Sequence, residues 1–354
     1  MPGSGASRRV RDPAEQHDPT GNVAAVADAP DSAALGRVIE RFVEGPVEVG
    51  GLRRYSGGAS RETWAVDATD RHGTLHELVL RRDPATQTSA ENRAVEYALL
   101  TAADAGGVPV PRVRALLGDD DGLGAGFLMD RVDGETIARR ILRDPEYDAA
   151  RPLLAGQAGA IAARIHAVEP GALPALPRLG AREQIEQQRA LLDAFEEPHP
   201  AFELGLRWLE QNAPADDAPL TLVHGDFRNG NFIVGPNGIR AVLDWELAHL
   251  GNPIEDLGWL CVKSWRFGNA GKVVGGFGAL DDLLSSYAQA GGAPVDEETV
   301  RFWVVLGTVK WGVICAGQAL AFVNGILRNV EMAALGRRVA EMEWDLLDLL
   351  DGGW

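Results

Sequence analysis

One short stretch of the sequence, Leu222–Val234, gathers polar side chains that could take part in chemistry. It reads LVHGDFRNGNFIV, with His224, Asp226 and Asn231 in a polar turn between two apolar runs. A carboxylate beside a hydroxyl group can orient it and accept its proton. An asparagine oxygen is a hard ligand of the kind that Mg²⁺ prefers. The pattern predicts strand, loop and strand, with the chemistry carried by the loop.

A second carboxylate follows at the end of the next apolar run. Asp244 ends the sequence AVLD, and Asn237-Gly238 is a strong two-residue hairpin signal between this run and the one before it. The hairpin would bring Asn231 and Asp244 to one end, where two oxygen ligands can hold Mg²⁺ against nucleotide phosphates. We therefore predict Asp226 as the catalytic carboxylate and Asn231 and Asp244 as metal ligands.

The spacing of these residues is also that of a known group of enzymes. A lone His-Gly-Asp is ordinary turn chemistry, but D-x-x-x-x-N between apolar runs, followed by a further Asp, is much more specific. The segment resembles the aminoglycoside phosphotransferase and choline kinase-like superfamily, which has the protein kinase fold. The run Asp244–Trp259, DWELAHLGNPIEDLGW, is similar to the branch that includes phosphotransferase domains fused to acyl-CoA dehydrogenases.

The resemblance, which covers roughly residues 32–345, implies an α+β fold of two lobes. A small antiparallel sheet would form the N-terminal lobe, helices would form most of the C-terminal lobe, and the active site would lie in the cleft between them. We predict a nucleotide-binding lobe over residues 32–133, and a lobe over 134–354 that carries the catalytic loop and the acceptor-binding helices. Residues 1–31 lack apolar periodicity and predict a disordered tail.

Within the N-terminal lobe, the nucleotide would be held by a loop and a basic side chain. Strands predicted over Leu52–Ala59 and Glu62–Ala68 flank a glycine-containing loop, in which Gly58 and Ser60 would cover the phosphates. The family usually places a lysine that pairs with the phosphates on the next strand. The first lysine of this chain is Lys263, so we expect an arginine to take that role.

Two neighbouring arginines are candidates for that role. The strand ELVLRR ends in Arg81 and Arg82, of which alternation allows one to point inward, and the alignment favours Arg81. A helix over Ser89–Ala105 offers Glu91 or Glu96 to hold it, and the family spacing favours Glu96. On the strand Gly126–Arg131, Met129 would lie beside the adenine near the hinge between the lobes.

Several conspicuous residues of the C-terminal lobe are predicted to be structural. The resemblance makes His224 and Asp256 braces of the catalytic loop, and we expect His166 to be a core residue of a helix over Leu153–Val168. Glu246 would anchor a turn or reach the metal through water. The remaining helices are predicted over Ala33–Val43, Glu135–Leu142, Ala181–Phe195, Phe202–Asn212, Leu257–Phe267, Leu280–Gln289, Glu297–Phe322 and Glu331–Leu350.

Composition limits the classes of partner. The net charge of −17 over 354 residues argues against nucleic acid and anionic membranes. Two cysteines, Cys261 and Cys315, do not make a disulfide framework, and no secretory signal is evident, so we predict a cytoplasmic protein. The apolar run Phe302–Val323 contains Lys310 near its middle, which favours a buried helix over a membrane span. The oligomeric state is not indicated.

Together these patterns predict transfer of the γ-phosphoryl group of ATP, or GTP, to a hydroxyl of a small molecule, with Mg²⁺. The acceptor could be an aminoglycoside, a macrolide, an amino alcohol or a hydroxyacyl-CoA. The acidic net charge favours a cation, whereas the DWELAHLGNP likeness favours the acyl-CoA branch. The alternative from another class is a non-catalytic nucleotide-binding module, which the missing lysine would fit. A protein kinase is disfavoured because no A-P-E-like segment follows Asp244.

Overall fold

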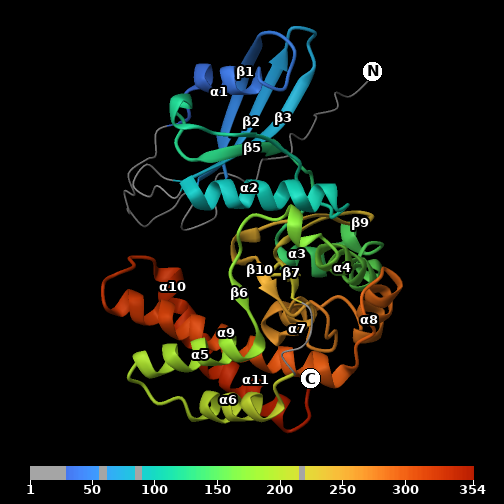
Figure 1. The fold of residues 1–354 in the computed structure, drawn as a ribbon, viewed down its shortest axis with the longest axis vertical. Helices are drawn as coiled ribbons and strands as arrows, with labels where there is room; N and C mark the ends of the chain where they lie inside the picture. The colour runs from blue at the N-terminus through green and yellow to red at the C-terminus, as the bar shows by residue number, and fades with distance from the viewer. Residues whose placement is uncertain (1–28, 56–61, 84–89, 215–219) are drawn as a thin grey trace, which may run out of the picture.

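The computed structural model shows a small sheet-containing lobe above a larger helical lobe (Figure 1). It describes residues 29–55, 62–83, 90–214 and 220–354, without the side chains of residues 90 and 91. The predicted phosphate loop with Gly58 and Ser60, the tail over residues 1–28 and the side chain of Glu91 lie outside this description.

The N-terminal lobe is a five-stranded antiparallel sheet in the order β1-β2-β3-β5-β4. Its strands are β1 Val47–Arg54, β2 Glu62–Asp70, β3 Leu75–Arg82, β4 Val113–Leu116 and β5 Gly126–Asp130. The α1 helix, Ser32–Ile39, packs with Leu78 and Leu80 on one face of the sheet. The α2 helix, Ala90–Ala105, shares a core with Val79 on the other face. Successive β3 side chains therefore alternate between two cores.

The first strand was predicted five residues too late in the chain. We expected Leu52–Ala59, whereas β1 spans Val47–Arg54. Val47 and Val49 alternate with a glutamate, which is a strand pattern, but the Gly-Gly pair that follows looks like a turn. In the structure the strand continues through this pair with a shift in register between Val49 and Gly51, as glycine permits at a bulge.

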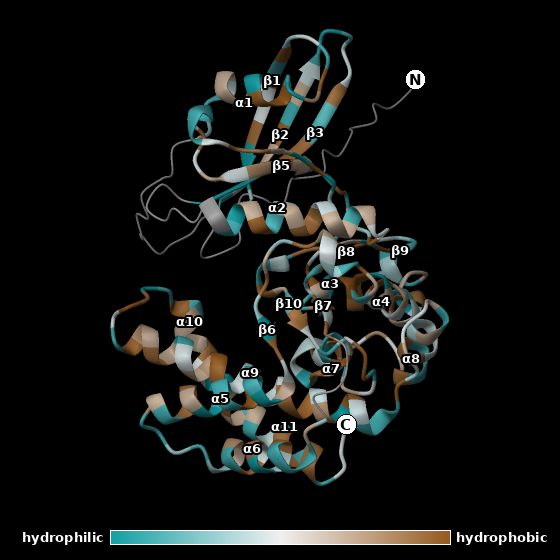
Figure 2. Cartoon of the chain, in the orientation of Figure 1, coloured by the Kyte–Doolittle hydropathy of each residue, from teal (hydrophilic) through white to brown (hydrophobic). Residues whose placement is uncertain are grey.

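The C-terminal lobe consists of helices around two small sheets. Its helices are α3 Ala138–Arg143, α4 Arg151–His166, α5 Ala181–Ala194, α6 Pro200–Asn212, α7 Ile254–Cys261, α8 Leu280–Gln289, α9 Glu297–Val323, α10 Val330–Leu335 and α11 Val339–Leu350. Its strands are β6 Arg178–Leu179, β7 Thr221–Val223, β8 Phe232–Gly235, β9 Gly238–Val242 and β10 His249–Gly251. Figure 2 shows apolar and polar residues mixed along the helices, as expected where one face of a helix packs and the other meets solvent. The predicted fold class is confirmed.

Two details of this lobe differ from the predictions. The single helix expected over Glu331–Leu350 is divided into α10 and α11 by a 3₁₀ turn, Gly336–Arg338, and a Cβ at Gly336 would lie 2.7 Å from Ala319 of α9. The parallel pair β6 and β10 was not expected, because strands of two and three residues are too short to show a periodic signal.

The α9 helix is long and apolar enough to span a membrane, the one such helix within the described ranges. Its first two thirds are mostly buried against α6, α7 and α11. Near its middle, Lys310 forms an ion pair with Glu255 at 3.4 Å. These contacts agree with the predicted buried helix.

The β8–β9 hairpin is fixed to the segments that join the two lobes. Backbone bonds of 2.9 Å link Glu135, just after the predicted hinge, to Val234 of β8 in both directions. The backbone N–H of Val242 in β9 donates to Pro109, which follows α2, also at 2.9 Å. These backbone hydrogen bonds hold the hairpin in a fixed position relative to the end of α2 and the predicted hinge. The lobe boundary near residues 133–134 stays a prediction.

Candidate active site

The catalytic loop between β7 and β8 brings two predicted site residues into direct contact. Asn231 Nδ2 donates to Asp226 Oδ2 at 2.6 Å and to its backbone oxygen at 2.9 Å. Asp226 Oδ1 accepts from Trp259 Nε1 at 2.7 Å and from Arg228 Nε at 2.9 Å. Three donors therefore fix the orientation of one carboxylate whose side chain is 17% exposed.

A buried carboxylate supports the backbone of this loop. The oxygens of Asp256 accept from the N–H groups of His224 at 2.8 Å and Gly225 at 3.0 Å. Gly225 has φ 79°, and a Cβ there would lie 2.4 Å from the Leu247 carbonyl, so only glycine fits. Burial alone would raise the pKa of Asp256, but its donors, His166 first among them, lower it below the ordinary value. The predicted bracing role of Asp256 is confirmed.

The two histidines near the loop also have structural partners. His224 is fully buried, donates from Nε2 to the Leu243 carbonyl at 2.9 Å and accepts the Asp226 N–H on Nδ1 at 3.2 Å. Burial lowers the pKa of His224, which keeps the ring neutral, and both nitrogens are used. His166 lies between Asp256, at 3.1 Å, and the Tyr287 hydroxyl, at 3.0 Å. Both predicted structural roles are confirmed, and neither ring is placed to act as the base.

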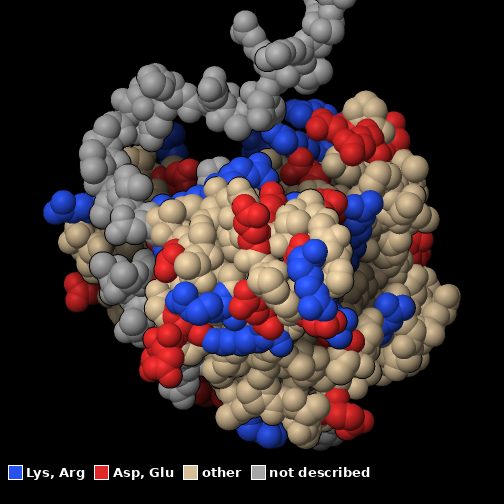
Figure 3. All heavy atoms as spheres, turned by 90° about the horizontal axis from the view of Figure 1, so that it is seen from above, with Lys and Arg blue, Asp and Glu red and all other residues tan. Residues whose placement is uncertain are grey.

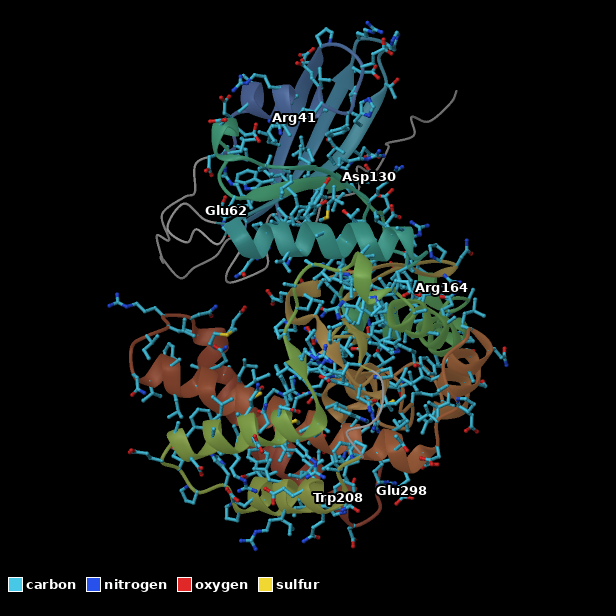
Figure 4. All side chains as sticks on the ribbon, viewed as in Figure 1. Arg41, Glu62, Asp130, Arg164, Trp208 and Glu298 are labelled. Atoms are coloured by element: carbon cyan, nitrogen blue, oxygen red, sulfur yellow. The ribbon has the colours of Figure 1, made fainter. Side chains whose placement is uncertain are left out.

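The alternation of β3 separates the two candidate arginines. Arg81 Nη1 lies 3.0 Å from Glu96 of α2, and its Nη2 donates to Asp244 Oδ1 at 2.7 Å. Arg82 instead donates from Nε to Glu62 at 2.8 Å; Glu62 is labelled in Figure 4, at the start of β2. Burial opposes the charge of Arg81, but Glu96 and Asp244 outweigh it and raise its pKa. Arg81 therefore links the two lobes through the predicted metal ligand.

The other predicted nucleotide contacts are placed less directly. Glu96 is 3% exposed and also pairs with Arg93 of its own helix. Met129 is 7% exposed and belongs to the core between the sheet and α2, so its place beside an adenine stays a prediction. Two cavities, of about 720 and 810 Å³, lie at the α5–α6 connection and beside α11, and their lining does not include Asp226. The expected nucleotide position is where Arg81 meets Asp244.

The hairpin presents two oxygen ligands that fit a magnesium ion. Leu243 N–H donates to the Asn231 carbonyl at 2.8 Å, which holds Asp244 beside the end of the catalytic loop. Because Asn231 Nδ2 is bonded to Asp226, its Oδ1 is the atom available for a cation. Asp244 has φ 61°, an uncommon backbone conformation for a non-glycine residue and one that often occurs at functional sites.

These two ligands do not by themselves make a complete metal site. No group of three or more His, Cys, Asp or Glu side chains that could hold a metal occurs among the described residues. Mg²⁺ commonly uses one or two protein oxygens and completes its shell with water and substrate phosphates. The donor set thus fits a cation that arrives with a nucleotide. Glu246 is exposed and adds to the negative charge near Arg81.

Trp259 and Arg228, which hold Asp226, were not predicted from the sequence. Both lie within the motif sequences DFR and DLGW. However, the spacing of the motif does not indicate what an arginine or a tryptophan beside it would contact. Glu255 was also missed: it accepts from Gln184 at 2.6 Å, and His249 lies 3.1 Å away. Two adjacent acidic residues in a helix usually lie on its exposed face. Only the burial of α7 shows that Glu255 has internal partners.

Replacement of Arg81 by alanine is expected to weaken ATP binding much more than replacement of Arg82. Arg81→Ala removes the buried cation that would pair with phosphate oxygens, and loss of one partner of a buried charge pair across a binding interface costs about 2–5 kcal/mol of binding free energy. Arg82→Ala breaks a comparable ion pair on the other face of the sheet and is the matched control. Titration calorimetry with a non-hydrolysable ATP analogue measures both. Equal losses of affinity would show that the choice of Arg81 is wrong.

Comparison with known proteins places these motifs in a family. The sequence matches the Phosphotransferase enzyme family over residues 51–302. A curated relative, acyl-CoA dehydrogenase family member 11 of Gallus gallus, is 28% identical over 315 residues, which cover 82% of this chain and 39% of that protein. The chain therefore spans about two fifths of the length of this relative.

Solved structures show the same arrangement of two lobes. A presumed aminoglycoside phosphotransferase from Ralstonia eutropha superposes with a TM-score of 0.71 at 24% identity, covering 90% of this chain and 98% of its own. A spectinomycin phosphotransferase in complex with ADP and spectinomycin gives 0.59 at 13% identity, covering 89% and 98%. These likenesses concern the fold, and they agree with the kinase-like arrangement described above.

Proposed function

Since the chain belongs to the phosphotransferase enzyme family, as its motifs predicted, we propose that it transfers the γ-phosphoryl group of ATP, or GTP, to a hydroxyl of a small molecule. The proposal rests mainly on two hydrogen bonds. Asp226 Oδ2 accepts from Asn231 Nδ2 at 2.6 Å, and Asp244 Oδ1 accepts from Arg81 Nη2 at 2.7 Å. These bonds support our assignment of Asp226 as proton acceptor, of Asn231 and Asp244 as metal ligands and of Arg81 as phosphate-binding cation. That set is what phosphoryl transfer requires.

Each residue has a distinct task in this proposal. Asp226 accepts a hydrogen bond from the acceptor hydroxyl and orients its oxygen toward the γ-phosphorus. Arg81, steadied by Glu96, pairs its remaining N–H donors with phosphate oxygens. Asn231 and Asp244 would hold Mg²⁺, which neutralises phosphate charge when bound. Most of the rate would come from positioning and charge neutralisation.

The backbone near Gly58 and Ser60 would cover the phosphates, and Met129 would contact the adenine. These two contacts rest on the family resemblance. Two buried free cysteines, Cys261 and Cys315, are the support for a reducing, cytoplasmic location.

Two observations bear on the acceptor. The relative named as an acyl-CoA dehydrogenase family member supports a hydroxyacyl-CoA. The net charge of −17 and the spectinomycin-bound neighbour support a cationic acceptor. Figure 3 shows acidic and basic side chains interspersed on the face seen from above, so the negative charge is not concentrated there. We propose a small hydroxylated molecule and leave the choice between the two classes to experiment.

A transfer assay with labelled nucleotide tests the proposal. The protein is incubated with γ-¹⁸O-labelled ATP, Mg²⁺ and pools of hydroxylated aminoglycosides, amino alcohols and acyl-CoAs, and products are screened by mass spectrometry. We expect one labelled organic phosphate, lost on chelation with EDTA and restored by Mg²⁺. A product that forms equally well in EDTA would contradict the metal assignment. Tight ATP binding without transfer to any pool would instead identify a non-catalytic nucleotide-binding module.

A further inference from the structure

The carboxylate of Asp226 is held unequally at its two oxygens. Oδ1 accepts two hydrogen bonds, from Trp259 Nε1 at 2.7 Å and Arg228 Nε at 2.9 Å. Oδ2 accepts one side-chain bond, from Asn231 at 2.6 Å. A carboxylate oxygen has two lone-pair sites, so Oδ1 is saturated by these donors while Oδ2 retains one site. The oxygen that meets an acceptor hydroxyl is therefore Oδ2.

Of the two donors to Oδ1, Trp259 is the more rigid. Its side chain belongs to α7, and the residue is 4% exposed. A Cβ added at Gly307 of α9 would lie 3.0 Å from the Trp259 ring, so α9 packs directly on the indole. Lys310 Nζ lies 5.1 Å from the ring centroid. The packing of α9 on the ring therefore restricts rotation of the indole.

Arg228 is held less firmly than Trp259. Its side chain is 24% exposed, and its guanidinium stacks 4.4 Å above the Trp265 ring. Arginine also loses considerable rotamer freedom when it is fixed in one geometry. Of the two Oδ1 donors, the indole is thus the one with a predetermined direction.

We propose that Trp259 is a positioning residue for phosphoryl transfer, one that presents Oδ2 of Asp226 to the acceptor. This proposal rests on the proposed function of Asp226. The indole N–H fixes the plane of the carboxylate, and α9 fixes the indole. Loss of the N–H lets the carboxylate turn about its terminal torsion, which is broad for aspartate. The orientation of the acceptor hydroxyl then deteriorates, while nucleotide contacts through Arg81 are unchanged.

Trp259→Phe removes the N–H and keeps most of the ring. We expect kcat to fall roughly 10- to 100-fold, the range for a misplaced reacting group, and KM for ATP to change by less than about twofold. Trp303→Phe is the matched control: Trp303 is 1% exposed, packs on Gly258 next to Trp259, and its indole N–H has no partner in the described part of the chain. Release of phosphate from Mg·ATP to water provides a rate that needs no identified acceptor.

A second measurement does not depend on activity. In protein labelled with ¹⁵N-tryptophan, Asp226→Asn converts a charge-assisted hydrogen bond into a weaker neutral one. We expect the Trp259 indole N–H resonance, assigned by its absence in Trp259→Phe, to move while that of Trp303 stays in place.

The two measurements separate failure of this proposal from failure of the proposed function. Equal kcat values for Trp259→Phe and Trp303→Phe, with wild-type turnover intact, would overturn the positioning role. An unmoved Trp259 resonance would overturn it as well, by showing that the bond to Asp226 is not formed. If the wild type neither hydrolyses nor transfers from ATP, the proposed function fails and the positioning role falls with it. A shifted resonance would then support only the Trp259–Asp226 bond.

Discussion

Asp226→Asn is expected to reduce phosphoryl transfer by about 10²- to 10⁴-fold, the usual contribution of a positioned proton acceptor. The amide preserves the size of the side chain but cannot accept a proton. Because the substitution leaves the side chains of Arg81 and Asp244 in place, the affinity for a non-hydrolysable ATP analogue should remain within about threefold of wild type. Rates from the mass-spectrometric transfer assay and affinities from calorimetry give the two values.

The control for this variant is Asp119→Asn, which changes an exposed acid of the N-terminal lobe and should leave both values unaltered. Loss of ATP binding together with transfer in Asp226→Asn would mean that Asp226 organises the nucleotide site. Full activity would mean that another group orients the acceptor. Either result would remove Asp226 from its assigned role.

Asp256→Ala is expected to lower the free energy of unfolding by about 3–5 kcal/mol, as when one member of a buried charged network is removed. The carboxylate is fully buried and accepts from His166 and from the backbone N–H groups of His224 and Gly225. The substitution leaves these donors without an acceptor. Urea unfolding followed by circular dichroism measures the loss, and Asp351→Ala, at an exposed acid, serves as the control.

The effect of Asp256→Ala should also depend on pH. The folded state lowers the pKa of Asp256 below its ordinary value of 3.8. The stabilisation it gives is therefore present above that value and is lost as the pH falls through the lowered one. The difference between wild type and variant should be constant near neutral pH and shrink in acid. A difference under about 1 kcal/mol at pH 7 would contradict the bracing role.

The sequence predicted those parts of the site that depend on local spacing. The dipeptide Asn237-Gly238 correctly predicted the position of the hairpin turn, since Gly235 pairs with Gly238 in the structure. Strand alternation reduced the choice to Arg81 or Arg82, and only the position of α2 shows which core each one faces. Spacing therefore located the motif, while packing decided which side chain it uses.

The parts that were missed depend on contacts between segments distant in sequence. Trp259 and Asp226 are 33 residues apart in the sequence, and no local sequence pattern predicts the hydrogen bond between them. The first strand was misplaced because its Gly-Gly pair favours a turn locally, whereas pairing with β2 carries the strand through it. Tertiary pairing overrides local propensity most easily where the propensity is weak, as it is in glycine-rich strands.

Anomalous diffraction from crystals grown with Mn²⁺ and a non-hydrolysable ATP analogue would locate the metal directly. We expect a manganese peak about 2.1 Å from Asn231 Oδ1 and from the Asp244 carboxylate, near the ideal distance for Mg²⁺. The γ-phosphate should face Asp226 Oδ2, with Arg81 on the phosphate oxygens. A bound nucleotide whose metal touches neither Asn231 nor Asp244 would contradict this expectation.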